Sequence, residues 1–305
     1  MSGKNVTEVR LADAAGIAEA ARILESGGLV AVPTETVYGL AARADSAEAV
    51  AKIYAAKGRP DFNPLIVHVR GVEQAERYAE FSAEARALAE AHWPGPLTLV
   101  LPRRAEAGLA AAVTAGLPTI ALRAPAHPVM QALLEQCGFP LAAPSANRSG
   151  FISPTSPAHV LASLDGRIDI VLDGGATQAG VESTIVAVRA DGSVEELRPG
   201  PIAAGTLGGG KGIEAPGQLA SHYAPGKPVR LNALAAEEGE FLIGFGAVAG
   251  DVTLSASGDL TEAAARLYAA LHEGARAAAP RIAVAPVPEE GVGRAINDRL
   301  QRAAA

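Results

Sequence analysis

A stretch rich in proline and glycine, residues 199–228, interrupts this sequence and carries no periodic pattern of apolar residues. On both sides of it, short apolar runs alternate with segments of helical spacing. We therefore predict an N-terminal unit at residues 1–205 and a small C-terminal unit at 229–305, joined by a linker at 206–228. Two units also agree with a length of 305 residues, since one domain typically takes about 150.

The apolar patterns predict the α/β or α+β class for the N-terminal unit. Strands are predicted at residues 29–33, 65–70, 97–102, 119–123, 168–173 and 183–189. Helices are predicted from Asp13, from Ser46, and at 83–91, 127–136 and 157–164. In the C-terminal unit we predict strands at 240–246 and 281–287, a helix at 261–278 and a final helix from about Arg294. The second unit is therefore predicted to be a small α/β domain.

The composition is that of a globular protein. Hydrophobic residues make up 49% of the chain and charged residues 19%, which is too apolar for a disordered protein. Alanine fills 67 positions, whereas Phe, Trp and Tyr together fill only 12, so we expect a core of small and aliphatic side chains. No apolar run approaches the roughly 20 residues of a membrane span. The first residues also lack the apolar core of a signal peptide.

Charge and cysteine content exclude further classes. The net charge of −7 at pH 7 is unfavourable for a general nucleic-acid binder, which needs a basic face. The single cysteine, Cys137, cannot form an internal disulfide and excludes a cysteine-based zinc site. We therefore expect a cytoplasmic protein. No GxSxG, HExxH or CxxC motif occurs, so serine hydrolases and zinc enzymes have little support.

Two polar motifs follow or precede predicted strands. PTETVYGLA (33–41) places Thr34, Glu35 and Thr36 at the end of a strand, where they could bind a small polar ligand or form an ordinary turn. KGRPDFNPLIVHV (57–69) groups Lys57 and Arg59 on an irregular loop. Such cations can hold phosphate oxygens, although basic residues are also common at the end of a helix.

Further polar residues lie in and after later strands. Thr119 and Arg123 are four residues apart on one strand and share a face, and the arginine needs an internal acid or a ligand anion. LAAPSANRSGFISPT (141–155) is a long polar loop that suits a nucleotide or phosphate, because loops of this length inside a domain are usually functional. ESTIV (182–186) and LRPG (197–200) add two hydroxyl groups and Arg198.

These motifs, taken in order with WPGPLTLVL (93–101), LRAP (122–125) and SHYAPGKPV (221–229), resemble the YrdC-like L-threonylcarbamoyladenylate synthases in their long, two-domain form. The resemblance covers nearly the whole chain. It implies a twisted mixed sheet with flanking helices, followed by a small Rossmann-like α/β domain. It also implies the reaction of L-threonine, bicarbonate or CO₂, and ATP to threonylcarbamoyl-AMP and pyrophosphate. The product of that family supplies the t6A modification at position 37 of tRNAs that read ANN codons.

The resemblance also implies roles for individual residues. The threonine or its carbamate would be held by Thr36, His68, Arg123, Ala143 and Ser183. ATP would be held by Arg59, Asn63, Thr119, Ser145, Ser153, Arg198 and Tyr223, with His222 a weaker candidate than Tyr223. Lys57 and Arg59 would act near the α-phosphate as the catalytic cations. His68 is open to two interpretations, a general base or an orienting group.

The implied cofactors and partners follow from this reaction. ATP would be a substrate that arrives with Mg²⁺, and no protein metal site or prosthetic group is expected. The expected partners are the tRNA-modifying threonylcarbamoyltransferase machinery and weakly bound tRNA. The linker would fold back over the pocket as a lid that excludes water. Two alternatives remain: a non-catalytic RNA-binding or ribosome-maturation factor, and a carbamoyltransferase-type domain.

Overall fold

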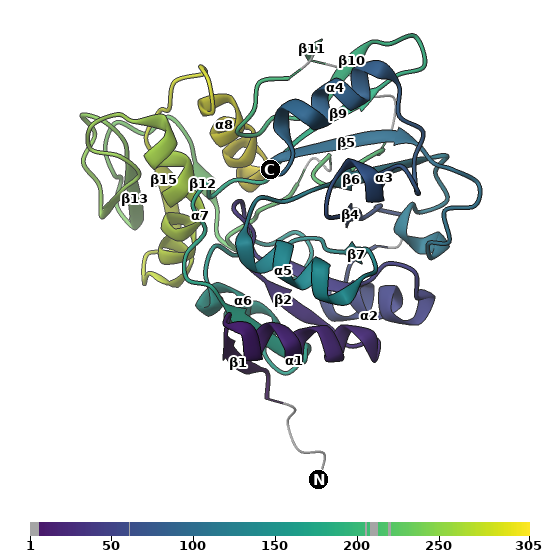
Figure 1. Ribbon diagram of the computed structural model, residues 1–305. Helices are drawn as coiled ribbons and strands as arrows, with labels where there is room; N and C mark the ends of the chain where they lie inside the picture. The colour runs from purple at the N-terminus through teal and green to yellow at the C-terminus, as the bar shows by residue number, and fades with distance from the viewer. Residues whose placement is uncertain (1–5, 61, 205, 208–212, 219–220) are drawn as a thin grey trace.

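The computed structural model describes residues 6–60, 62–204, 206–207, 213–218 and 221–305, which form two sheets with flanking helices (Figure 1). The strands of the larger sheet are β1 (Glu8–Leu11), β2 (Val30–Val32), β3 (Gly39–Arg43), β4 (Ile66–His68), β5 (Leu97–Pro102), β6 (Thr119–Arg123), β7 (Leu141–Ala142), β8 (Ile170–Asp173), β9 (Thr184–Val188), β10 (Val194–Arg198) and β11 (Thr206–Leu207). The helices of the N-terminal unit are α1 (Ala14–Glu25), α2 (Ala47–Lys57), α3 (Val72–Ala75), α4 (Ala83–His92), α5 (Pro128–Cys137) and α6 (Pro157–Leu164), with a 3₁₀ turn at Ala111–Val113.

The larger sheet is mixed, with the strand order β1-β8-β2-β3-β7-β4-β6-β5-β9-β10-β11 among the described residues. The sheet contains parallel pairs (β1 with β8, β4 with β6, β5 with β9) and antiparallel ones (β3 with β7, β5 with β6). In the parallel pair of β4 and β6, His68 lies opposite Arg123. This register places two of the predicted binding residues side by side near the centre of the sheet.

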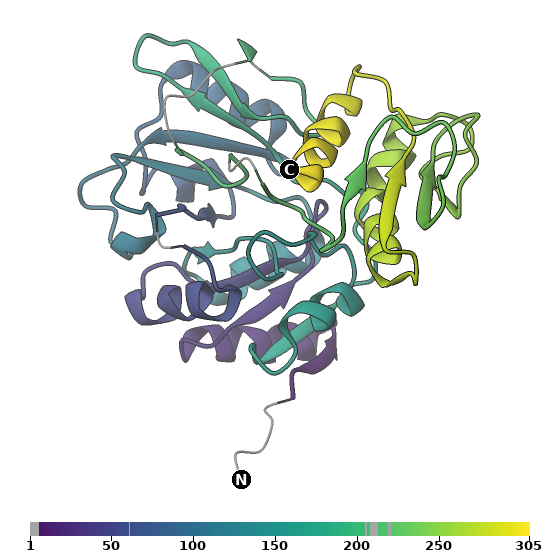
Figure 2. The ribbon, with the colours of Figure 1, turned by 180° about the vertical axis from the view of Figure 1, so that it is seen from behind.

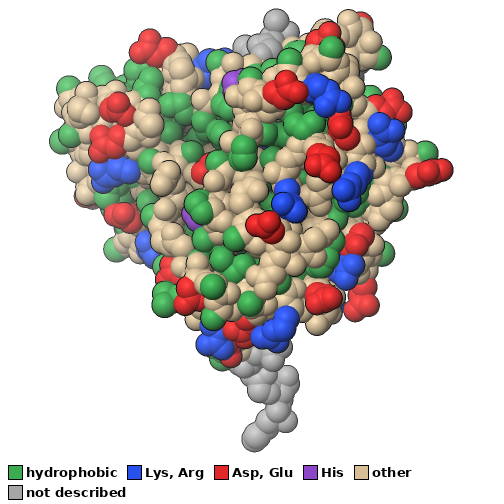
Figure 3. All heavy atoms as spheres, viewed as in Figure 1, with side chains coloured by type: hydrophobic (Ala, Val, Ile, Leu, Met, Phe, Trp, Pro, Cys, Tyr) green, Lys and Arg blue, Asp and Glu red, His purple; other side chains and the backbone are tan. Residues whose placement is uncertain are grey.

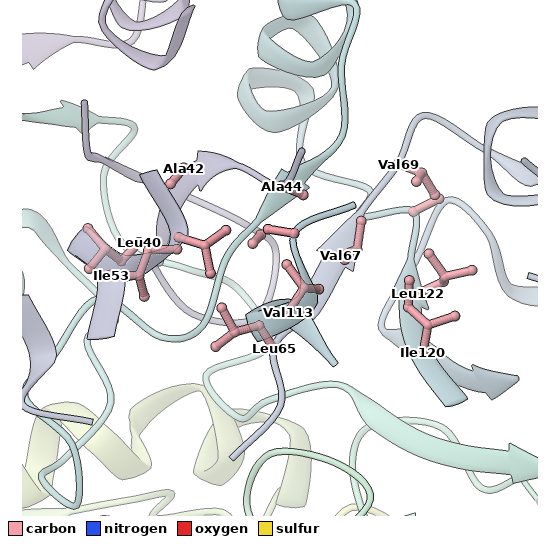
Figure 4. Close-up of a cluster of buried hydrophobic side chains, with 14 of the residues drawn as sticks. Leu40, Ala42, Ala44, Ile53, Leu65, Val67, Val69, Val113, Ile120 and Leu122 are labelled. Atoms are coloured by element: carbon pink, nitrogen blue, oxygen red, sulfur yellow. The ribbon is translucent and has the colours of Figure 1, made fainter. Parts of the chain in front are cut away.

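The two faces of the central strands are covered differently. Leu65, Val67 and Val69 face a large apolar core, because side chains alternate along a strand (Figure 4). In Figure 4 these side chains lie with Ile120, Leu122 and Val113 and with residues of β3 and α2. The opposite face carries Ile66 in a smaller cluster that includes Ala215 of the linker. Part of this second face is therefore covered by linker chain.

The C-terminal unit has its own parallel sheet. Its strands are β12 (Val229–Arg230), β13 (Glu240–Gly244), β14 (Val252–Thr253) and β15 (Arg281–Val284), in the order β12-β15-β13-β14, with helices α7 (Leu260–Arg276) and α8 (Gly293–Ala304). Its core also takes in Val37, Ile152 and Val181 of the N-terminal unit. Figures 1 and 2 show α8 lying between the larger sheet and the rest of the C-terminal unit.

The predicted fold class is confirmed, and each predicted strand and helix corresponds to an observed one. The sequence pattern did not predict the helix α3 or the strands β1, β3, β7, β10, β11, β12 and β14. The linker is not wholly irregular, because β11 pairs with β10. Residues 208–212 and 219–220 of the predicted linker lie outside the described residues. No helix in the described ranges is long and apolar enough to cross a membrane.

Candidate active site

A pocket on the linker-covered face of the larger sheet collects polar residues from several loops and strands. Its described lining consists of Thr34, Thr36, Val37, Gly39, Arg59, Ile66, His68, Arg123, Ala143, Pro144, Ser145, Glu182, Ser183, Arg198, Pro216, Gly217, His222 and Tyr223. A larger hollow of about 910 Å³ lies elsewhere, between α1, α2 and the loop around Arg167, and contains none of the predicted site residues. The polar lining and the predicted site residues therefore occur together in the smaller pocket and not in the larger hollow.

Most of the residues predicted for threonine and ATP come together in this pocket. The lining includes Thr36, His68, Arg123, Ala143, Ser183, Arg59, Ser145, Arg198 and Tyr223. Four predicted residues are not among it: Lys57, Asn63, Thr119 and Ser153. The geometry thus brings together residues that span positions 36 to 223 of the chain.

Arg123 is a pocket cation that pairs with a carboxylate. Its Nη1 donates to Thr36 Oγ1 at 3.0 Å, and its Nη2 contacts Glu35 Oε1 at 2.5 Å. Burial alone would raise the pKa of Glu35, but the charge of Arg123 and its hydrogen bond lower that pKa below its usual value. A hydrogen bond from Thr34 Oγ1 to the carbonyl of Val37, at 2.7 Å, holds the shape of the loop that carries Glu35 and Thr36. The sequence indicates that Arg123 needs an internal acid or a ligand anion. The structure provides an internal acid, Glu35, which the sequence did not identify as its partner.

His68 lies beside Arg123 and is completely enclosed. Its Nδ1 has no hydrogen-bond partner among the described residues. Burial, and next the charge of Arg123, lower the pKa of His68 to about 3. The imidazole is therefore neutral near pH 7, with one ring nitrogen directed at no protein group.

Two further arginines of the pocket bind only backbone and hydroxyl groups. Arg59 Nη2 donates to the carbonyl of Pro64 at 2.9 Å, and burial lowers the pKa of Arg59 to about 10. Arg198 donates to the carbonyl of Ser183 from Nε and Nη2, at 3.1 and 2.9 Å, and to its hydroxyl at 3.0 Å. Neither arginine has an ion-pair partner among the described residues. Buried cations without counter-charge favour an anionic ligand.

The four predicted residues outside the lining lie close to it or in supporting positions. Lys57 Nζ donates to the backbone carbonyls of Ser145 and Asn147, so it holds the polar loop in place. The Asn63 side chain is buried and its amide has no partner among the described residues. Thr119 is half-buried at the start of β6, opposite Pro102. Ser153 is fully buried and donates to Glu182 at 2.5 Å.

The linker supplies part of the pocket wall. Pro216 and Gly217 lie against Arg198, whose Nη1 donates to the Pro216 carbonyl at 3.3 Å. A Cβ on Gly217 would lie 2.9 Å from Arg198 Cδ, so only glycine allows this approach. Tyr223 is buried with a positive φ of 63°, and its hydroxyl has no partner among the described residues. Burial raises the pKa of Tyr223 to about 12.

Two charged residues of the site escaped the sequence analysis. Glu182 lines the pocket. Its Oε2 accepts a hydrogen bond from Nε of Arg299, in α8, at 3.1 Å. Glu182 stands two residues before the buried strand β9, which is a recognisable signal for a partnered carboxylate. Arg299 gave no signal, because helical spacing alone does not distinguish a buried arginine from an exposed one.

Within the described ranges, no group of three or more His, Cys, Asp or Glu side chains could hold a metal ion. The charge of the pocket is instead carried by arginines. Arg123 and Arg299 are each paired with a carboxylate, whereas Arg59 and Arg198 have no such partner in the part of the chain that the structure describes. The arrangement can bind a molecule with a carboxylate and one with several phosphates next to each other.

Comparison with known protein families agrees with this geometry. Residues 22–200 match the Sua5–YciO–YrdC family, whose profile carries the description "Telomere recombination". Residues 193–305 match a second family, described as "Threonylcarbamoyl-AMP synthase, C-terminal domain". The chain belongs to the Sua5–YciO–YrdC family.

Individual members of the family are similar over almost their full length. The threonylcarbamoyl-AMP synthase of Bacillus subtilis is 42% identical over 94% of this chain and 92% of its own. That of Pyrococcus abyssi is 40% identical over 93% of this chain and 92% of its own. The crystal structure of P. abyssi Sua5 complexed with L-threonine superimposes with a TM-score of 0.88 and 37% identity, covering 98% of this chain and 97% of that chain.

Proposed function

We propose that this protein is a threonylcarbamoyl-AMP synthase, an enzyme that makes threonylcarbamoyl-AMP and pyrophosphate from L-threonine, bicarbonate or CO₂, and ATP. The observation that carries the proposal is the pocket itself. One enclosed space holds a paired arginine suited to a carboxylate and two arginines suited to phosphates, which have no ion-pair partner among the residues that the structure describes. Relatives 40–42% identical over more than nine-tenths of this chain carry the same activity in their names.

Threonine is proposed to bind around Arg123. The guanidinium presents a fork of donors that matches a carboxylate, and its contacts to Thr36 and Glu35 set its orientation. Thr36, His68, Ala143 and Ser183 complete a small enclosure for the amino acid. The P. abyssi protein, which this chain resembles, is known in a complex with L-threonine.

ATP is proposed to bind toward Arg59 and Arg198, beside the polar loop that contains Ser145. Charge-assisted bonds to phosphate are the strongest that these two side chains can make. Tyr223 of the linker would contact the nucleotide from above, and Asn63, Thr119 and Ser153 remain further proposed contacts. The proposed cations near the α-phosphate are Arg59 and Lys57, although Lys57 donates to two backbone carbonyls in this structure.

The chemistry requires positioning more than it requires a nucleophilic side chain. The threonine amine attacks CO₂ and loses a proton, which gives a carbamate. A carbamate oxygen then attacks the α-phosphorus of ATP, and the bond to pyrophosphate breaks. The pocket's arginines stabilise the charge on the phosphates during this step. A neutral His68 with a free ring nitrogen fits an orienting contact to the carbamate or amine.

Exclusion of water is the proposed role of the linker. A threonine carbamate is short-lived in water, so its synthesis and adenylylation need one shielded space. Pro216, Gly217, His222 and Tyr223 close the pocket on the side opposite the sheet. We propose that this part of the chain is a covering segment between a catalytic domain at 1–205 and a C-terminal domain at 229–305.

Several finer assignments belong to the same proposal. The reaction makes the enzyme a nucleotidyltransferase, with Mg²⁺ held through the ATP phosphates, since the pocket offers no carboxylate cluster. The product would pass to the tRNA-modifying threonylcarbamoyltransferase machinery in the cytoplasm. General RNA binding is not favoured: on the face in Figure 3, basic and acidic side chains are interspersed. Direct tRNA contact, if present, would be weak.

Incorporation of labelled bicarbonate tests the proposal. The purified protein is incubated with ATP, L-threonine and ¹⁴C-bicarbonate, and nucleotides are separated at once by chromatography. We expect the label in a new nucleotide product that forms only with threonine present. Formation of ADP without a labelled nucleotide would instead indicate an ATPase and overturn the proposal.

A further inference from the structure

The C-terminal unit reaches the pocket through one carboxylate, that of Glu182. Its Oε2 accepts hydrogen bonds from Arg299 Nε at 3.1 Å and from the Tyr268 hydroxyl at 2.8 Å. Its Oε1 accepts from Ser153 Oγ at 2.5 Å. Both Arg299 and Tyr268 are fully buried and come from the helices α8 and α7. Glu182 itself lies in the pocket lining. Two helices of the second unit therefore converge on a single group of the candidate active site.

Arg299 is fixed by more than this ion pair. Its Nη1 donates to the carbonyl of Pro199 at 2.6 Å and to Asp298 at 2.9 Å, and its guanidinium lies 5.6 Å from the ring centre of Tyr223. The side chain is thus tied to the segment that follows β10, through Pro199, and to a residue of the pocket wall, Tyr223. These contacts restrict the orientation of the Arg299 side chain, which allows it to hold the Glu182 carboxylate in place.

The charges around the pocket show why Glu182 needs this partner. Arg123 is neutralised by Glu35, so Arg59 and Arg198 are the lining cations without an ion pair among the described residues. After Arg299, Arg198 exerts the next strongest attraction on the Glu182 carboxylate. Without Arg299, the negative charge of Glu182 would act on Arg198. It would then neutralise one of the two cations that would bind the phosphates.

We propose that Arg299, supported by Tyr268, is a positioning residue of the nucleotide site: it binds and neutralises Glu182 and so leaves Arg198 available to the phosphates of ATP. The inference rests on the proposed function for the identity of the anion. It assigns the C-terminal unit a direct part in ATP affinity. Threonine is a zwitterion without net charge, so its binding depends much less on the charge of the pocket than the binding of ATP does.

The test compares three variants with the wild-type chain. Arg299→Gln removes the partner of Glu182, and the double variant Glu182→Gln/Arg299→Gln removes both charges. Arg294→Gln is the matched control, because Arg294 lies on the same helix and pairs with Glu196 of β10 at 2.5 Å, and neither residue lines the pocket. The dissociation constant for ATP is measured by titration calorimetry, and KM values for ATP and threonine by pyrophosphate release.

We expect Arg299→Gln to weaken ATP binding by a factor of about ten or more and to raise the KM for threonine far less. The double variant should return to within about threefold of the wild type, although it lacks the same arginine. Arg294→Gln should bind ATP as the wild type does. Equal losses in Arg299→Gln and Arg294→Gln, or no recovery in the double variant, would show a merely structural role and overturn the inference.

A second variant covers the case in which Arg299→Gln does not fold. Tyr268→Phe keeps the ring and removes one donor to Glu182, and we expect it to weaken ATP binding by a factor of about three. An unchanged ATP affinity in that variant would overturn the inference. The proposed function fails separately: a wild-type chain that binds ATP but releases no pyrophosphate with threonine and bicarbonate would contradict the synthase activity, while the calorimetric comparison would still decide the role of Arg299.

Discussion

The Arg123 guanidinium and the Glu35 carboxylate form a buried ion pair at the end of β6, with Nη2 and Oε1 2.5 Å apart. The same arginine also donates to the Thr36 hydroxyl and to the carbonyl of Gly95, at 3.0 and 3.2 Å. A buried charge needs such partners, because an unpaired one costs several kcal/mol. The pair therefore holds Arg123 oriented in the pocket before the α-carboxylate of threonine arrives.

Replacing Arg123 with lysine tests its role in threonine binding. An ammonium group cannot contact Thr36, Glu35 and a carboxylate in the planar geometry of a guanidinium. We expect Arg123→Lys to raise the KM for threonine at least about tenfold, with the KM for ATP changed by less than about twofold. Steady-state pyrophosphate release measures both, with the exposed Arg103→Lys as control. A matching rise in the KM for ATP would contradict a threonine-specific role.

The pH dependence of activity distinguishes the two interpretations of His68. Burial lowers the pKa of His68 to about 3, so its imidazole stays neutral throughout the range from pH 6 to 8.5. His68→Gln retains a neutral hydrogen-bonding group. We therefore expect kcat/KM for threonine to fall in this variant while its pH profile keeps the wild-type shape. Loss of an acidic limb from the profile would instead show that His68 titrates as a general base.

Lys57 supports the polar loop from within the protein. Lys57→Met keeps the aliphatic stem but leaves the carbonyls of Ser145 and Asn147 without their donor. We expect the free energy of unfolding to fall by about 2 kcal/mol and the KM for ATP to rise, because Ser145 lines the pocket. Urea unfolding provides the measurement. The exposed Lys52→Met, on the same helix, is the control, and an equal effect there would refute the assignment.

Acid stability should depend on Glu182. Burial alone would raise its pKa, but Arg299, Arg198 and two hydroxyl donors together lower the pKa to about 2. A carboxylate whose pKa is lower in the folded state stabilises the fold above its unfolded value near 4.5, and this contribution disappears as the pH falls toward 2. At neutral pH it amounts to about 3 kcal/mol.

The corresponding variant is Glu182→Gln, compared with the wild type in urea at pH 7 and at pH 3.5. We expect the wild type to lose more stability than the variant over this interval, because only the wild type takes up a proton at Glu182 on unfolding. Parallel losses in both proteins would mean that the pKa of Glu182 is not lowered.

Much of the fold could be predicted from the sequence, because the buried strands are short runs rich in valine, isoleucine and leucine. β5 and β9 are examples: five of six and all five of their residues, respectively, are buried. Short strands such as β7 and β14 escaped because two residues carry no period, and they exist only through pairing with neighbours. β3 escaped because its sequence, GLAAR, has weak strand propensity and is held by β2 and β7.

The candidate site was predictable where its residues lie in recognisable motifs. Arg59, Arg123 and Arg198 each stand in one of the motifs recognised in the sequence, and all three reach the pocket. The partners of these cations were harder to predict, since pairing depends on distances across the fold. Arg299 stands 117 residues from Glu182 in the sequence, in a helix whose pattern gave no reason to bury an arginine.

Gly180 explains how the C-terminal unit comes close enough to reach Glu182. Its φ is +70°, and a Cβ at this position would lie 2.2 Å from the carbonyl oxygen of Ala264 in α7. We expect Gly180→Ala to push α7 away from the loop that precedes Glu182, with a large loss of activity and increased cleavage of the linker by protease. The control is Gly175→Ala, which shares a positive φ but has no atom within 4 Å of the added carbon. Equal behaviour of the two variants would contradict the close-approach argument.

Pyrophosphate release tests the central claim most directly. The protein is incubated with ATP alone, with each of threonine and bicarbonate added singly, and with both, alongside the Arg59→Ala variant. We predict release only when both co-substrates are present, and its loss in the variant, because Arg59 is a buried cation of the pocket without an ion-pair partner among the described residues. Release that continues without threonine, or that is undiminished in Arg59→Ala, would contradict the account.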